Sequence, residues 1–125
     1  MPKTILIIGE DPAEIDFDAP GTPKDVSAET ITSGLEGSVA RLRADGYVAT
    51  LLLTRDPATL EEQVREALDN EAPDVVVIGA GLRILPALAA QFEQLMNVLH
   101  EYAPNAKLAF NSQPGDSDIA ARRWV

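Results

Sequence analysis

The chain has 125 residues, of which 46% are hydrophobic and 24% are charged. This length and composition are typical of one globular domain and exclude a disordered chain. Cysteine is absent, which excludes disulfides, thiolate metal sites and cysteine catalysis. A formal charge of −10 at pH 7 disfavours binding to nucleic acid or to an anionic membrane, because both are negatively charged. We therefore expect an acidic, cytoplasmic single domain spanning residues 1–125.

Short apolar runs predict four β-strands. In chain order, these runs are Ile5–Ile8, Val48–Leu53, Val75–Ile78 and Leu108–Phe110. The first and third runs are continuous rather than alternating, which is typical of parallel strands that are covered on both faces. These two strands are therefore expected at the centre of the sheet.

Helical periodicity separates the apolar runs. Apolar residues recur every three or four positions over 31–42, 60–68 and 88–99, which predicts one helix in each range. The last ten residues predict a short terminal helix that is capped by Asp116, with Ile119 and Trp124 facing inward. The third helix is expected to begin only near Pro86.

The strict alternation of strands and helices predicts the fold class. We expect a three-layer α/β/α domain with a four-stranded parallel sheet of order 2-1-3-4, in a flavodoxin-like or Rossmann-like arrangement. The first two strands are expected to begin near Thr4 and Val48, 44 residues apart, whereas a strand-plus-helix unit needs about 30. The excess predicts an acidic, Pro/Gly-rich insertion loop over residues 10–26.

Open parallel sheets bind ligands at the carboxyl ends of their strands, which locates the candidate site. The candidate ligand-binding residues are Gly9, Glu10 and Asp11 after the first strand, Gly79, Gly81 and Arg83 after the third, and Asn111, Ser112 and Asp116 after the fourth. A dinucleotide site is not expected, because the third glycine of its fingerprint is missing. The Gly-Lys-Ser/Thr ending of a phosphate-binding P-loop is also missing.

The glycines and the polar residues after the fourth strand also have a purely structural interpretation. Gly79 and Gly81 either let the backbone approach a ligand or permit a tight turn. Asn111 and Ser112, together with Asp116, either orient a ligand or cap a turn and the following helix. The sequence leaves both interpretations open.

The charged residues leave the nature of the ligand open. Arg83 either meets an anionic ligand or pairs with Glu10 or Asp11. Five carboxylates in residues 10–18 either hold Mg²⁺ or form a solvated acidic loop: Glu10, Asp11, Glu14, Asp16 and Asp18. If a cation binds, Glu10 and Asp11 are its expected ligands, and no other cofactor is evident.

No catalytic residue is predicted. The chain has one histidine, His100, which is expected late in a helix and near the amino edge of the sheet. Ser112 is expected at the opposite edge, so the two residues form no nucleophile–base pair. With one histidine and no cysteine, a zinc site is not expected either.

Two segments carry a resemblance to a known family. Residues 3–12, KTILIIGEDP, resemble the opening strand of the receiver domain of two-component response regulators, and residues 73–86, PDVVVIGAGLRILP, are similar to its third strand and following loop. The resemblance implies a flavodoxin-like fold and makes Glu10 and Asp11 the acidic pair that binds magnesium. Gly79 stands where the family has its phosphate-accepting aspartate, so the resemblance implies that phosphorelay chemistry is lost. The whole chain also resembles a group of small uncharacterised bacterial proteins, which carry no function to transfer.

These observations lead to one main functional hypothesis and to several alternatives. The main hypothesis is a non-catalytic binding or regulatory module that takes a small molecule or a protein partner at the carboxyl edge of its sheet. Apolar residues in the loop after the third strand, Leu82, Ile84 and Leu85, support it. One alternative is an enzyme or binding protein for a small anionic or phosphorylated compound, with Mg²⁺ as a possible cofactor. Another is a degenerate receiver that signals by docking alone, and Ala89 and Val98 suggest a homodimer.

Overall fold

The computed structural model describes residues 2–18, 27–70 and 72–125, so part of the expected insertion loop lies outside the described residues. Four strands form one parallel sheet in the order β2-β1-β3-β4, which confirms the predicted α/β class and strand order. The strands are β1 (Thr4–Glu10), β2 (Val48–Thr54), β3 (Val75–Ile78) and β4 (Lys107–Phe110).

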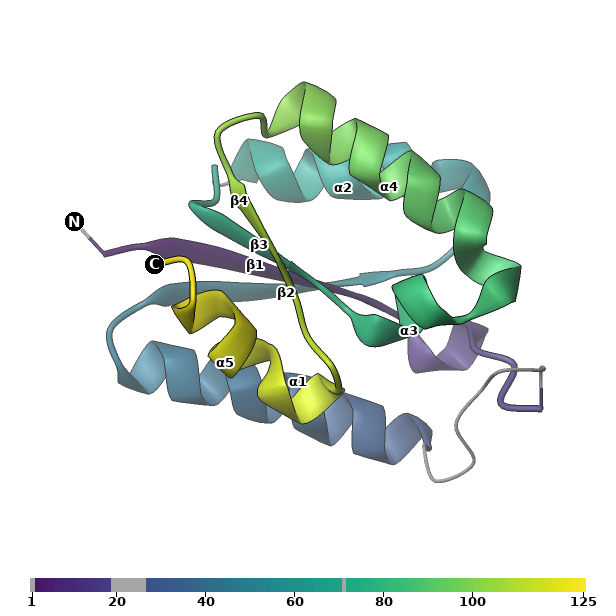
Figure 1. Ribbon diagram of the computed structural model, residues 1–125, viewed down its shortest axis with the longest axis horizontal. Coiled ribbons are helices and arrows are strands. Elements are labelled where there is room, and N and C mark those ends of the chain that lie inside the picture. Colours follow the sequence, from purple (N-terminus) through teal and green to yellow (C-terminus); the bar gives the residue numbers. More distant parts are fainter. Residues whose placement is uncertain (1, 19–26, 71) are drawn as a thin grey trace.

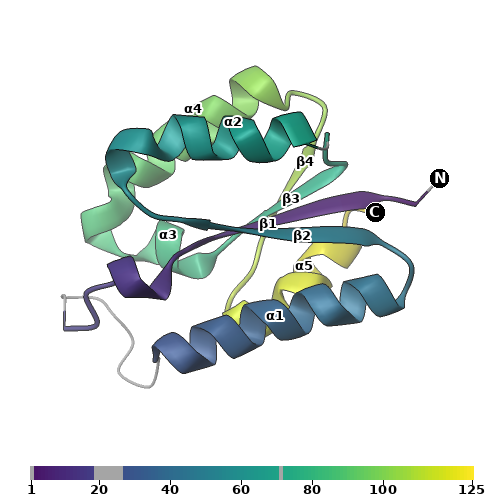
Figure 2. The same cartoon turned by 180° about the vertical axis from the view of Figure 1, so that it is seen from behind.

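Helices cover both faces of the sheet, as Figures 1 and 2 show. On one face lie α1 (Ala28–Ala44) and α5 (Ser117–Arg122), and on the other lie α2 (Leu60–Asn70) and α4 (Ala89–Tyr102). The side chains of β1 alternate between the two faces. Ile5 and Ile7 pack in the core beneath α1, and Leu6 and Ile8 pack beneath α2 and α4. This central strand is therefore buried along its whole length, as its continuous apolar run predicts.

The loop after β3 is more regular than the sequence predicts. A short helix, α3 (Ala80–Ile84), follows β3 directly, and the turn Pro86–Leu88 leads from it into α4. The expectation that helical structure begins only near Pro86 is wrong. Because α3 starts at once, it lies at the carboxyl edge of the sheet, beside the ends of β1 and β3 (Figure 1).

The inward orientation predicted for Ile119 and Trp124 is also wrong. These side chains are 58% and 51% exposed. The buried positions of α5 are instead Ser117, Asp118, Ala120 and Ala121. Small residues let α5 pack closely on the sheet and α1, and this places the bulky side chains of the helix outside.

A partly buried polar network holds α5 and the loop before it to α1. Arg41 Nε lies 3.0 Å from Asp118 Oδ2, and Ser38 Oγ donates to Pro114 O at 3.1 Å. Asp118 is 5% exposed, and the hydrogen bond and charge of Arg41 hold the pKa of its carboxyl below the usual value. This ion pair requires Asp118 to face inward, and the sequence patterns do not indicate it.

Val98, which suggested a second apolar face for self-association, is 6% exposed and packs in the core shared by α2 and α4. Val98 is therefore not available at the surface for contact with a second copy of the chain, and it does not support the homodimer hypothesis. Ala89, the other residue, is exposed at the start of α4.

Gly34 of α1 lies in close contact with the loop after β4. A Cβ atom at this position would lie 2.7 Å from Pro114 Cβ and 2.8 Å from Gly115 N. Backbone atoms cannot move aside as a flexible side chain does. We therefore expect Gly34→Ala to lower the free energy of unfolding by about 1–3 kcal/mol.

Gly37 provides the matched control in the same helix. Its Cβ would contact only the end of the Arg41 side chain, at 3.3 Å from Nη1, and no backbone atom. Alanine is favoured over glycine inside helices by up to about 1 kcal/mol, so Gly37→Ala should be neutral or stabilising. Urea denaturation of both variants measures the difference, and equal effects at the two positions would contradict the close packing of α1 on this loop.

Candidate functional site

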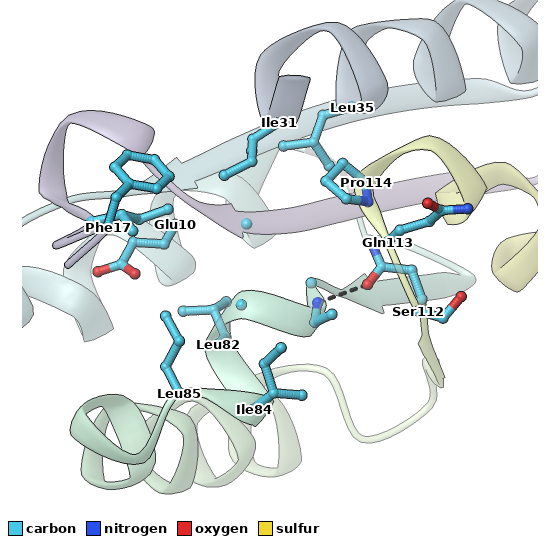
Figure 3. A pocket seen from close by; sticks show the side chains of 16 residues that line it. Glu10, Phe17, Ile31, Leu35, Leu82, Ile84, Leu85, Ser112, Gln113 and Pro114 are labelled. Carbon is cyan, nitrogen blue, oxygen red and sulfur yellow. Dashed lines mark hydrogen bonds between the residues drawn. The ribbon is translucent and has the colours of Figure 1, made fainter. Parts of the chain in front are cut away.

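A pocket of about 120 Å³ lies at the carboxyl edge of the sheet. It is bounded by the end of β1, by α3, by the first turns of α1 and by the loop after β4 (Figure 3). Most of its wall is apolar, built from Phe17, Ile31, Leu35, Leu82, Ile84 and Leu85. The polar side chains that reach it are Glu10, Asn111, Ser112 and Gln113.

Unequal strand lengths create this pocket. Ile8 of β1 pairs with Ile78, the last residue of β3, whereas Gly9 and Glu10 continue beside β2 only. The end of β1 therefore lacks a strand on its β3 side, and α3 faces it across the gap. At Gly79 the chain turns away, and a Cβ atom there would lie 3.3 Å from Ile8 O. This tight approach supports the turn interpretation of that glycine.

Glu10 is the one ionisable side chain among the described residues that line the pocket. The residue is only 8% exposed, and its Oε2 is buried without a hydrogen-bond partner among the described residues. Burial, with a smaller contribution from the negative charge of Glu14, raises the pKa of the Glu10 carboxyl to about 7. Figure 3 shows Glu10 beside Phe17 on one side of the pocket, opposite Ser112, Gln113 and Pro114.

Asp11 is separated from Glu10 and does not line the pocket. Its Oδ1 accepts from Ala13 N at 3.0 Å, and its Oδ2 accepts from Arg55 Nε at 2.8 Å. The hydrogen bond from Ala13 and the contact with Arg55 hold the pKa of Asp11 below its usual value. Asp11 therefore caps the short helix Pro12–Glu14 and ties it to the end of β2. In the part of the chain that the structure describes, no group of three or more histidine, cysteine or acidic side chains is placed to hold a metal ion.

Asn111 connects three segments beneath the pocket. Its Oδ1 accepts from Ala80 N at 2.7 Å, and its Nδ2 donates to Ser117 Oγ at 2.8 Å. The first of these bonds is the dashed line in Figure 3. The residue is 3% exposed, so both ends of its amide are occupied within the protein. Asn111 thus positions α3 and α5 relative to β4.

Ser112 and Asp116 shape the loop after β4. Asp116 Oδ1 accepts from Ser112 N at 3.0 Å and from Gln113 N at 3.2 Å, and Asp116 Oδ2 accepts from Ser112 Oγ. These bonds are those of a turn followed by a helix start, which supports the structural interpretation of Asp116. Ser112 nevertheless lines the pocket, whereas Asp116 does not.

Arg83 is directed away from the pocket. Its Nη2 donates to Asn111 O, and its guanidinium carbon lies 5.1 Å from the centroid of the Phe110 ring. Burial holds the pKa of Arg83 below its usual value. Of the two interpretations left open for Arg83, the pairing with Glu10 or Asp11 is wrong, because Asp11 pairs with Arg55 and the guanidinium of Arg83 lies over the ring of Phe110.

The structure thus brings some of the predicted residues together and leaves others outside. Around the pocket lie Gly9, Glu10, Gly79, Gly81, Asn111 and Ser112, whereas Asp11, Arg83 and Asp116 lie outside its lining. The sequence patterns do not indicate the apolar wall contributed by α1. Ile31 and Leu35 belong to the apolar stripe of that helix, but the stripe extends past the edge of the sheet. The predicted helix is longer than the strand that it covers, and this difference in length is the feature of the sequence that could have indicated Ile31 and Leu35.

No family model matches the sequence, and no curated protein matches it. A solved structure titled "Crystal structure of putative lipoprotein from Peptoclostridium difficile 630 (fragment)" is similar in fold, with a TM-score of 0.53 and 11% sequence identity. The similarity covers 94% of this chain and 90% of that chain. At this identity the likeness concerns the α/β fold alone. Within the described residues, no helix has the length and apolar character needed to cross a membrane.

Proposed function

We propose that the chain is a non-catalytic binding module that holds a small, mainly apolar molecule in the pocket at the carboxyl edge of its sheet. The observation that carries the proposal is a concave apolar site formed by the connections after β1, β3 and β4 and by part of α1. A buried carboxyl group is its one ionisable side chain among the described lining residues.

The size and the chemistry of the pocket support a ligand about as large as one ring. A dry apolar cavity of about 150 Å³ holds a benzene molecule, and this pocket of about 120 Å³ is partly open to solvent. Burial of roughly 100 Å² of ligand surface contributes about 2–3 kcal/mol, before the cost of association. A ring-sized probe is therefore expected to bind weakly, with a Kd of about 10 mM or higher, and the natural ligand extends beyond the ring.

The position of Glu10 argues against the alternative of an anionic or phosphorylated ligand. An anion in the pocket would face a carboxyl group, and Arg83 is engaged with Asn111 and Phe110 instead of the pocket. The described lining residues also include no histidine, lysine or cysteine to act as a base or nucleophile beside Glu10. A magnesium-assisted reaction draws no support from Asp11, whose carboxylate is bound to Arg55.

The receiver-like and flavodoxin-like relationships, together with the bacterial and cytoplasmic setting, stay predictions from the sequence. A docking role for a degenerate receiver would use the same edge of the sheet. The pocket favours a small molecule over such a partner, because its apolar side chains converge in a concave site instead of forming a flat surface.

Benzyl alcohol, a neutral ring-sized probe, tests the proposal by amide NMR titration. We expect chemical-shift changes concentrated at Gly81, Leu82 and Asn111 in the unmodified protein. Ile84 lines the pocket and is 49% exposed, so Ile84→Ser should leave the fold intact. Loss of its apolar contact, about 1 kcal/mol, should weaken binding about fivefold.

Ile119 is the matched control, because it is 58% exposed and lies outside the pocket. Ile119→Ser should leave the affinity for benzyl alcohol unchanged. The proposal fails if benzyl alcohol causes no saturable shift, or if both serine variants weaken binding to the same extent.

A further inference from the structure

Glu10 Oε2 is the feature of the pocket that nothing in the described protein explains. A buried polar atom without a partner is costly, because it has lost its water and gained no hydrogen bond in return. Of the other polar side chains around the pocket, Asn111 bonds at both ends of its amide, Ser112 Oγ bonds to Asp116, and Gln113 is exposed to solvent. The wall of the pocket thus contains a buried carboxyl group with one oxygen that has no hydrogen-bond partner among the described residues.

Resting on the binding function proposed above, we propose that the ligand carries a protonated amine at the end of its apolar body, and that the carboxylate of Glu10 binds this amine. An ammonium group donates hydrogen bonds to a carboxylate and neutralises its charge in surroundings where water is scarce. The apolar body then contacts Leu82, Leu85 and the side chains of α1. A neutral hydroxyl in the same place gains the hydrogen bond without the charge, and a carboxylate is repelled.

The charged groups around Glu10 are compatible with an incoming cation. From the turn after β1, Glu14 adds negative charge, and Asp11 is paired with Arg55 from the end of β2. From α3, Arg83 is bonded to Asn111 O and lines no part of the pocket. Over the pocket itself, α1 contributes Ile31 and Leu35, and the loop after β4 contributes the uncharged Ser112, Gln113 and Pro114. No described cation therefore lies in the pocket to compete for the Glu10 carboxylate.

Titration of Glu10 gives the inference its pH dependence. The carboxyl of Glu10 loses its proton near pH 7 in the free protein. Below that pH the carboxyl group is neutral, so its interaction with an amine is little stronger than its interaction with an alcohol. Above that pH the carboxylate is charged, and the preference for the amine should appear.

Benzylamine, benzyl alcohol and benzoate form a matched series of probes for this test, by NMR titration of the full chain in 150 mM salt. At pH 8 we expect benzylamine to bind about tenfold more tightly than benzyl alcohol, the range of one charge-assisted hydrogen bond, and benzoate to bind most weakly. At pH 5.5 the affinities of amine and alcohol should lie within about twofold of each other.

Glu10→Gln should abolish the preference for benzylamine at pH 8 while benzyl alcohol still binds. Glu62→Gln removes one negative charge from the exposed face of α2 and should leave the preference for benzylamine unchanged. This variant is the control for nonspecific attraction of a cationic probe to an acidic protein. If benzyl alcohol binds but benzylamine binds no better at pH 8, or if Glu10→Gln keeps the preference, the inference is wrong and the binding function stands. If none of the three probes binds, both fail.

Discussion

Replacement of Glu10 by glutamine is expected to stabilise the protein progressively, relative to the unmodified chain, as the pH rises from 4.5 to 8. Burial raises the pKa of this carboxyl from 4.5 to about 7 in the folded protein. Below pH 4.5 the group is protonated in the folded and the unfolded states, and it contributes no pH dependence. Between the two pKa values the unfolded chain ionises more readily, so the folded state loses stability as the pH rises.

The expected size follows from the shift, since each pKa unit corresponds to about 1.4 kcal/mol. Over the interval from 4.5 to about 7, the loss in the unmodified chain is of the order of 3 kcal/mol. Glutamine has the same shape and does not titrate, so the variant escapes this loss. It retains only a constant offset from its altered hydrogen bonding.

Urea denaturation at pH 4.5 and pH 8 measures the effect. The free energy of unfolding of Glu10→Gln, minus that of the unmodified protein, should be about 2–3 kcal/mol larger at pH 8 than at pH 4.5. The exposed Glu62→Gln serves as the control, with a change below about 0.5 kcal/mol between the two pH values. If the free energies of unfolding of Glu10→Gln and the unmodified protein differ by the same amount at both pH values, Glu10 is solvated. The pocket then contains no buried carboxyl group.

Replacement of Asn111 by alanine is expected to destabilise the protein by about 2–4 kcal/mol. The change removes the acceptor of Ala80 N and the donor to Ser117 Oγ, and it leaves a small void at a site that is 3% exposed. Ala80 N then remains unpaired at the start of α3. Because α3 forms one wall of the pocket, the same variant should also weaken binding of benzyl alcohol at temperatures where it is folded.

Asn97 of α4 provides the comparison for this prediction. Its Nδ2 donates to Glu93 O at 2.9 Å, but the bond is exposed to water, which can replace it. Asn97→Ala should therefore change the free energy of unfolding by less than about 0.5 kcal/mol. Urea denaturation of the two variants distinguishes the roles, and similar losses at positions 97 and 111 would mean that Asn111 does not hold α3 in place.

The fold and the location of the site could be predicted because they depend on patterns that are local in the sequence. The continuous apolar runs at Ile5–Ile8 and Val75–Ile78 fixed the central strands, and the parallel topology then placed Glu10 near Gly79. The alternation of strands and helices also implied that the connections after β1, β3 and β4 meet at one edge. All three contribute to the pocket.

The roles of individual polar residues could not be predicted in the same way. Glu10 and Asp11 are neighbours in the sequence, yet they have different partners. Asp11 binds Arg55, which is 44 positions away, whereas Glu10 lines the pocket and its Oε2 has no partner among the described residues. Likewise, Ile119 faces outward because Asp118 faces Arg41 of α1. Contacts between segments so far apart carry no periodic signal, and they decide which of two adjacent side chains is free to bind.

A crystal structure of the protein soaked with 4-bromobenzylamine at pH 8 tests the central claim most directly, because the anomalous signal of bromine locates the ring. The account predicts a bromine peak in the pocket, with the ring against Leu82 and Leu85 and the nitrogen about 2.7–3.2 Å from a Glu10 carboxylate oxygen. Bromine found only elsewhere, for example beside the exposed Ile119 and Trp124, with the pocket filled by water, would contradict it.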